Sequence, residues 1–503
     1  MSNLKINIIT NYIGQGYLIF AGIICTPLYL SYLGAESYGL VGFFILLQNW
    51  LNLLDMGLST TLGRQVAVAR TSRDHRFTKF SNLLRSFEII FFILALLIFI
   101  SIYLNADWIS QKWIKPNQLN SKNIALCINI MALIIGLKFF ATIYRSGING
   151  FEDQIWLNKI TIVTASFKYL FSLIILAYIS SEVVFFFVYQ FIISILEVLL
   201  LRHRFYSNLP SDILIPKFFR VNWRYFTEVV PFALGITYTT AIVAALTQLD
   251  KLLLSGSLSL MEFGYYSLLT LLSGGIINLS VPVFLAYQPK LTMLASKNNI
   301  AEMIALYRGM TQLITWITFT AASLIILYSQ QIIYILTSDN NIYTWGSDVL
   351  FWYTLGSACY VIGTFQYYLQ NAFGTLKLYV YGSTVALLIQ VPVIYFVTMQ
   401  YGAIGAGKLW FCFSVVWFLI FTSTVHSKLI PNFHMNWLIK DMIPLLVWII
   451  ILTYFMKNYI HIEIYQSKII IFMELILIGF SFLVATSVCS SLIRDKVFSF
   501  FKA

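Results

Sequence analysis

Apolar runs of about 20 residues recur along almost the whole chain and are separated by short polar stretches. A run of this length is what an α-helix needs to cross the hydrocarbon core of a bilayer. We count about fourteen such runs, at residues 8–33, 38–68, 84–105, 121–146, 157–180, 182–202, 228–254, 261–286, 306–330, 348–372, 378–400, 402–425, 440–460 and 468–492. The pattern predicts an all-α integral membrane protein with about fourteen transmembrane helices.

Composition supports this interpretation, because 59% of the 503 residues are hydrophobic and only 10% are charged. A soluble protein carries about 25% charged residues, so an ordinary soluble enzyme is excluded. Connections between the runs are no longer than about 25 residues, which leaves no room for a soluble domain. The sequence also lacks a nucleotide-binding P-loop motif, which argues against a nucleotide-driven pump. The five cysteines form no C-x-x-C pair, and we predict neither a metal site nor a disulfide.

The net charge of +12 comes from 32 Lys and Arg against 20 Asp and Glu. In a membrane protein, basic residues concentrate in short cytoplasmic loops. Placing the amino terminus in the cytoplasm assigns about 23 of the 32 basic residues to that side. We therefore expect both termini to be cytoplasmic and the charge to reflect topology, with membrane lipids and no nucleic acid as partners.

A weak internal repeat emerges when the chain is shifted by about 225 residues. Leu33 then falls on Leu258, and Gly39 falls on Gly264. Six predicted spans separate the two copies, so both copies would have the same orientation in the membrane. The repeat predicts two parallel lobes with a central pathway between them.

Polar residues inside predicted spans are candidates for function, because a charge at bilayer depth costs at least about 2.5 kcal/mol. In the second span Gln48, Asn52, Asp55 and Ser59 recur at helical spacing and would share one face of a continuous helix. Such a face either lines a cavity or forms hydrogen bonds between helices. Asp55 is the candidate for ion coupling, since a partly desolvated carboxylate could exchange H⁺ or bind Na⁺.

Basic side chains occur in the fourth and fifth spans, where Lys138, Arg145 and Lys168 have no obvious acidic partner in their own helices. Unpaired cations at this depth suggest an anion site. The alternative is a structural salt bridge to Asp55 or Glu88.

The tenth span carries an aromatic and glycine face that includes Tyr360 and Tyr367. Aromatic faces of this kind stack against sugar rings, but they are equally typical of helix packing.

The segment from Asn11 to Arg70 carries a family resemblance. Its stretches PLYLSYLGAESYGLVGFF and LLDMGLSTTLGRQVAVAR resemble the bacterial O-antigen flippases, in the polysaccharide-transport branch of the multidrug/oligosaccharidyl-lipid/polysaccharide exporter superfamily. The chain departs from the usual family pattern at Ser59-Thr60, where Ser-Pro is common, and at Gln65, where an acidic residue is common.

The resemblance implies two six-helix lobes, placed at 1–226 and 227–426, with two additional transmembrane helices and a cytoplasmic tail in 427–503. It implies a transporter of the bacterial inner membrane that performs no covalent chemistry and needs no cofactor. The substrate would be an undecaprenyl-diphosphate-linked polysaccharide repeat unit, moved to the periplasmic leaflet by alternating access. Lys138, Lys168 and Arg145 would then hold the diphosphate, with Gln48, Asn52, Tyr360 and Tyr367 as further substrate contacts. A polysaccharide polymerase and a chain-length regulator would be its protein partners.

Two other functions remain open on the sequence. A cation-coupled multidrug exporter of the same superfamily would share the fold, but its cavity should be acidic. An intramembrane polysaccharide polymerase is disfavoured because the chain has no sizeable external loop.

Overall fold

Helices make up almost all of the computed structural model, which describes residues 2–55, 57–70, 76–209, 223–337, 342–463 and 467–488. Within these ranges the only β-type pairing is an isolated bridge between Lys115 and Ser259. Ten helices of the described part are long and apolar enough to cross a membrane. The predicted all-α membrane fold is confirmed, and the number fourteen remains a prediction.

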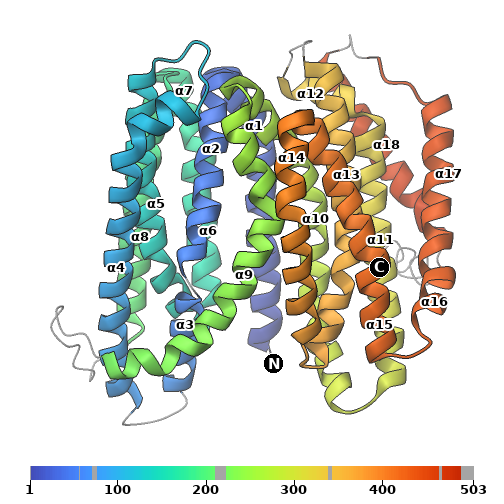
Figure 1. The fold of residues 1–503 in the computed structure, drawn as a ribbon, viewed down its shortest axis with the longest axis horizontal. Coiled ribbons are helices and arrows are strands. Elements are labelled where there is room, and N and C mark those ends of the chain that lie inside the picture. The colour runs from blue at the N-terminus through green and yellow to red at the C-terminus, as the bar shows by residue number, and fades with distance from the viewer. Residues whose placement is uncertain are drawn as a thin grey trace. The chain divides into compact units, whose positions relative to one another are not determined.

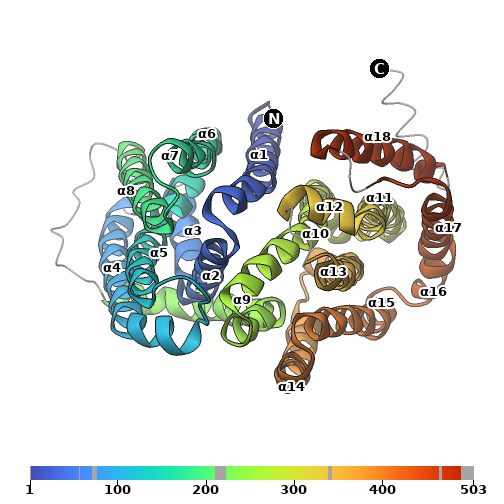
Figure 2. The same cartoon turned by 90° about the horizontal axis from the view of Figure 1, so that it is seen from above.

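The chain divides into two compact units, and the first spans Met1–Gly264. Most of its helices run alongside one another in Figure 1 and are viewed nearly end-on in Figure 2, whereas the last of them slopes across the others. They are α1 (Ser2–Leu33), α2 (Ala35–Leu51), the 3₁₀ segment η1 (Asn52–Asp55), α3 (Leu58–Arg70), α4 (Arg76–Trp108), the π-helical η2 (Ile109–Trp113), α5 (Ser121–Gly150), α6 (Gln154–Ser166), the π-helical η3 (Phe167–Phe171), α7 (Ser172–Tyr178), α8 (Val183–Ser207) and α9 (Trp223–Ser257).

The second unit spans Tyr265–Ala503. It contains most of α10 (Leu260–Ser296), then α11 (Ile300–Leu327), α12 (Ser329–Thr337), α13 (Tyr343–Ala372), α14 (Lys377–Val416), the π-helical η5 (Trp417–Thr422), α15 (Ser423–Leu429), α16 (His434–Trp437), the π-helical η6 (Leu438–Met442), α17 (Ile443–Tyr459) and α18 (Lys468–Ser487). Gly402, with φ of 58°, kinks α14 where the sequence predicted a break between two spans.

The boundary between the units lies at residues 264 and 265, whereas the lobes expected from the sequence meet at 226 and 227. The difference arises because α9 packs against α2, α3 and α4 of the first unit. The lobe boundaries, including a separate segment 427–503, remain predictions.

The second predicted span is not one continuous helix, which corrects the expectation of a single polar face. Helix α2 ends at Leu51, η1 follows, and Gly57 adopts a φ of 61° before α3 begins. A left-handed backbone conformation suits glycine because it has no Cβ. The interruption changes the direction in which residues before and after it point, so regular helical spacing does not hold across it.

The carboxy-terminal helices α17 and α18 pack against α11 inside the second unit. Arg308 of α11 forms a two-point ion pair with the buried Asp441, through Nε at 2.5 Å and Nη2 at 2.7 Å. Gln312 also donates to Asp441, and Trp316 donates to Thr486 on α18. Paired charges and satisfied donors are what allow polar groups to be buried between membrane helices.

Two glycines make a close crossing between α2 and the first turn of α10, inside the first unit. A Cβ added to Gly39 would lie 2.1 Å from the carbonyl oxygen of Leu260, and one added to Gly264 would lie 2.4 Å from that of Ala35. Both distances are far below van der Waals contact, so this approach needs glycine at both positions. The contact is reciprocal, because the internal repeat of 225 residues relates Gly39 to Gly264 and Ala35 to Leu260.

The loop before α5 is held by Glu36, which is nearly buried at the start of α2. Its carboxylate accepts hydrogen bonds from the backbone N–H groups of Asn117 (2.6 Å), Gln118 (3.0 Å) and Leu119 (3.3 Å). The residue therefore satisfies three donors that have no helix to pair with.

Replacing Glu36 by alanine is expected to lower the thermal unfolding midpoint of the purified protein, because the loop loses its hydrogen bonds to a carboxylate, and a hydrogen bond to a charged group contributes about 1.5–3 kcal/mol. Differential scanning fluorimetry in detergent measures the shift. Glu182→Ala is the matched control, since this exposed glutamate side chain has no partner among the described residues. Equal midpoints for the two variants would contradict the role of Glu36.

Candidate functional site

Lys168 lies in the π-helical segment η3, between α6 and α7. A π-helix widens the turn and leaves carbonyl groups to be satisfied by other partners, and such segments often occur at functional sites. Here the carbonyl of Lys168 accepts hydrogen bonds from Tyr29 (3.0 Å), Gln190 (2.8 Å) and Ser172 (2.8 Å). Side chains from α1, α7 and α8 thus fix the backbone at Lys168.

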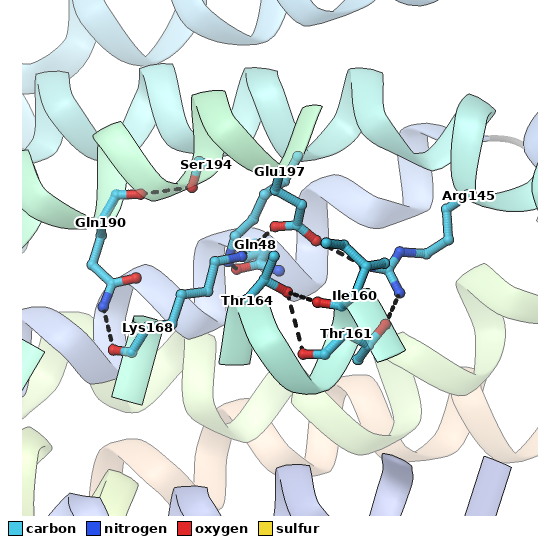
Figure 3. Close-up of polar contacts among 10 residues, drawn as sticks. Gln48, Arg145, Ile160, Thr161, Thr164, Lys168, Gln190, Ser194 and Glu197 are labelled. Carbon is cyan, nitrogen blue, oxygen red and sulfur yellow. Dashed lines mark hydrogen bonds and ion pairs between the residues drawn. The ribbon is translucent and has the colours of Figure 1, made fainter. Parts of the chain in front are cut away.

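Glu197 of α8 lies between two cations (Figure 3). One carboxylate oxygen pairs with the ammonium of Lys168, and the other pairs with Nη2 of Arg145 at 2.7 Å. Arg145 also donates to Thr161 of α6 at 2.9 Å. The Glu197 and Lys168 side chains are only 10% and 17% exposed, whereas Arg145 is 37% exposed. The pair at Lys168 is therefore the more desolvated of the two.

Lys138 is the third cation of this region and comes from the middle of α5. Its ammonium donates to Oε1 of Gln48 on α2 at 2.9 Å and lies 5.1 Å from the ring centroid of Phe44. A neutral amide oxygen and an aromatic face both stabilise an ammonium without neutralising it. Neither contact brings a negative charge to Lys138.

These residues form what we call the cation cluster: Lys138, Arg145 and Lys168, with Glu197 as counter-ion. Three basic side chains lie around one carboxylate, so the cluster has a formal excess of two positive charges. Charges inside a membrane protein mark substrate and ion pathways when they are not fully neutralised. The cluster can therefore bind an anion, with ammonium and guanidinium groups as donors.

The salt bridges considered from the sequence had the wrong acidic partners. Asp55 accepts from the backbone N–H (3.1 Å) and hydroxyl (2.5 Å) of Ser59, at the start of α3. Glu88 accepts from Arg85, Tyr144 and Tyr206. The role of Asp55 in ion coupling remains a prediction, and the side chain of Asn52 lies outside the part of the chain that is described.

Tyr360 and Tyr367 lie on α13 in the second unit. The ring of Tyr360 lies 5.0 Å from that of Trp410 on α14, and the ring of Tyr367 lies 4.8 Å from that of Tyr379. Both tyrosines therefore take part in packing between α13 and α14. Contact with a sugar remains a prediction for both.

Glu197 is the site residue to which the sequence assigned no role beyond pairing with a cation. A signal was present, because Gln190, Ser194 and Glu197 are separated by four and three residues on an otherwise apolar helix. That spacing places them on one face of α8, where all three are buried. A buried polar face in a membrane span points to a partner on a neighbouring helix.

The sequence model of the polysaccharide biosynthesis protein family matches residues 4–295, more than half of the chain. The chain belongs to this family, as the resemblance of residues 11–70 indicated. Comparison with curated protein sequences finds no match.

Solved structures of transporters share the fold. A structure described as the lipid II flippase MurJ in an inward closed conformation superposes with a TM-score of 0.73 at 16% identity, covering 98% of this chain and 99% of that one. An inward-facing multidrug resistance MATE family transporter of the MOP superfamily gives 0.66 at 14% identity, covering 82% and 96%. A MOP superfamily transporter from Pyrococcus furiosus gives 0.55 at 12% identity, covering 84% and 96%.

Proposed function

We propose that this protein is a flippase for an anionic, lipid-linked oligosaccharide. The substrate is an undecaprenyl-diphosphate-linked repeat unit of O-antigen or a related polysaccharide, moved from the cytoplasmic to the periplasmic leaflet of the bacterial inner membrane. Transport proceeds by alternating access, driven by an ion gradient and without covalent chemistry. Polysaccharide polymerase and chain-length regulator act on the product at the outer face.

The excess positive charge of the cation cluster is the observation that carries this proposal. A diphosphate bears at least two negative charges and offers several acceptor oxygens, which complements Lys138, Lys168 and Arg145. Glu197 forms ion pairs with two of these cations, Lys168 and Arg145. The incoming diphosphate takes over those contacts, so that binding exchanges one set of charge-assisted hydrogen bonds for another.

The test is deletion of the gene in its own host. Lipid-linked repeat units are expected to accumulate, surface polysaccharide is expected to disappear in staining, and a plasmid copy should restore it. Unchanged surface polysaccharide in the deletion strain would contradict the proposal.

A cation-coupled multidrug exporter is the second candidate, since the fold is shared with MATE transporters. Binding of apolar cations would require an acidic cavity, and the cation cluster has the opposite sign. Susceptibility to cationic drugs is therefore expected to be the same in the deletion strain and its parent. Increased susceptibility with normal surface polysaccharide would favour the exporter.

Asp55→Asn is expected to abolish the dependence of transport on an imposed H⁺ or Na⁺ gradient in proteoliposomes, because the variant cannot carry an exchangeable charge. The amide oxygen of asparagine can still accept from the backbone N–H of Ser59, so the start of α3 should be preserved. Asp107→Asn, at an exposed aspartate near the end of α4, is the control. Wild-type ion dependence in Asp55→Asn would assign coupling to another residue.

A further inference from the structure

An apolar groove of about 360 Å³ runs along the outer side of the first unit, between α6 with η3 and α8. It is lined by Val163, Thr164, Phe167, Ile193, Leu196, Leu199, Leu200 and His203. None of the cation cluster residues lines it. Most of the apolar walls are exposed at the surface of helices that cross the membrane. The groove is therefore open to the hydrocarbon of the bilayer and is separate from the cluster.

One end of this groove is basic. Lys159 and Val163 of α6 and Phe167 at the start of η3 are spaced four residues apart and share one helix face. On α8, Leu199 and His203 have the same spacing. Because α6 and α7 are followed by a short turn and then by α8, Lys159 and His203 lie at the same end of the groove.

The start of α6 and the end of α8 are held together by an ion pair between Asp153 and Arg204 (2.7 Å). Arg204 also lies 5.5 Å from the ring centroid of Trp156. Tryptophan is enriched at the level of lipid headgroups, which marks this end as the membrane interface. Unlike Arg204, Lys159 and His203 have no hydrogen bond or ion pair with the described residues, so both are available to a ligand.

We propose that the groove binds an anionic glycerophospholipid, with one acyl chain between α6 and α8 and its phosphate at Lys159 and His203. The apolar walls match the acyl chain, Lys159 supplies a positive charge, and His203 supplies a second hydrogen-bond donor for the phosphate. A pocket of this size lies in the range that holds a substantial part of a small-molecule ligand. The site lies at the end that the charge distribution assigns to the cytoplasmic leaflet, where anionic lipids attract basic residues.

The experiment is native mass spectrometry of the purified full chain, mixed with equal amounts of phosphatidylglycerol and phosphatidylcholine that have the same acyl chains. The wild type is expected to retain phosphatidylglycerol preferentially. Replacing both Lys159 and His203 by glutamine should reduce that retention by about fivefold for each group that contacts the phosphate, leaving phosphatidylcholine unchanged. Lys297→Gln, at an exposed lysine between α10 and α11, should behave as wild type.

A second variant tests the groove itself. Val163→Trp fills it and should reduce retention of both lipids. An unchanged lipid ratio in the Lys159 and His203 double variant would overturn the proposal. Preferential retention of undecaprenyl phosphate over phosphatidylglycerol would show that the groove does not bind a glycerophospholipid. A stable dimer that dissociates in the Val163→Trp variant would show instead that a second copy of the chain covers the groove. All these measurements are independent of transport, so they can fail while the proposed flippase function holds.

Discussion

Replacing Lys168 by alanine is expected to eliminate surface polysaccharide while leaving the amount of protein in the membrane unchanged. The change removes one of two cations that contact Glu197 and lowers the excess charge of the cation cluster from two to one. A charge-assisted hydrogen bond contributes about 1.5–3 kcal/mol, so binding of a diphosphate should weaken by about 10- to 100-fold. Staining of the cell surface and immunoblotting of membranes measure the two quantities.

The same result is expected for Lys138→Ala, because Gln48 is the only polar partner of Lys138 among the described residues and no other basic group replaces the lost ammonium. Lys168→Arg should retain part of the activity, since it preserves the charge. Lys122→Ala, at an exposed lysine near the start of α5, is the matched control. Wild-type display from both Lys138→Ala and Lys168→Ala would exclude the cation cluster as the substrate site.

Glu197→Gln is expected to lower the stability of the empty protein and to tighten its binding of a diphosphate ligand. Removing one partner of a buried ion pair typically costs about 3 kcal/mol, because the remaining charges are left uncompensated. A diphosphate can supply the missing negative charge, so it should stabilise the variant more than it stabilises the wild type. Thermal unfolding with increasing farnesyl diphosphate, a short prenyl diphosphate, measures both effects.

Glu88→Gln is the appropriate comparison for this experiment. Glu88 is buried in the same unit and is bound by Arg85, Tyr144 and Tyr206, away from the cation cluster. Its replacement should also lower stability, but farnesyl diphosphate should not restore the loss. Equal stabilisation of the two variants would show that the ligand effect does not arise at Glu197.

The helical hairpins were predictable because each span has its own apolar run and its own polar break. The kink at Gly402 and the basic residues of α5 and η3 could likewise be placed from local sequence. The interruption after Leu51 was missed because the apolar pattern continues through it. It depends on the positive φ of Gly57 and on the hydrogen bonds between Asp55 and Ser59. Neither feature can be inferred from the hydrophobicity of the residues.

In the cation cluster, too, contacts between distant segments of the chain could not be predicted from the sequence. The π-helical turn at Lys168 is supported by Tyr29 and Gln190, which lie on other helices. Pairing of Glu197 with Lys168 and Arg145 likewise joins three segments of the chain. The cations could be identified from the sequence, because a charged residue within an apolar run is easily recognised. Their acidic partner, Glu197, is determined by the packing of α8 against the other helices and could not be.

The glycine crossing of α2 and α10 has the geometry of an isologous interface, in which each of two equivalent surfaces meets its own counterpart. Gly39 contacts Leu260 as Gly264 contacts Ala35, and the internal repeat makes these pairs equivalent. Such reciprocity is what a symmetric homodimer produces when two identical chains associate. The two glycines therefore depend on each other, since a side chain at either position would collide with the main chain of the opposite helix.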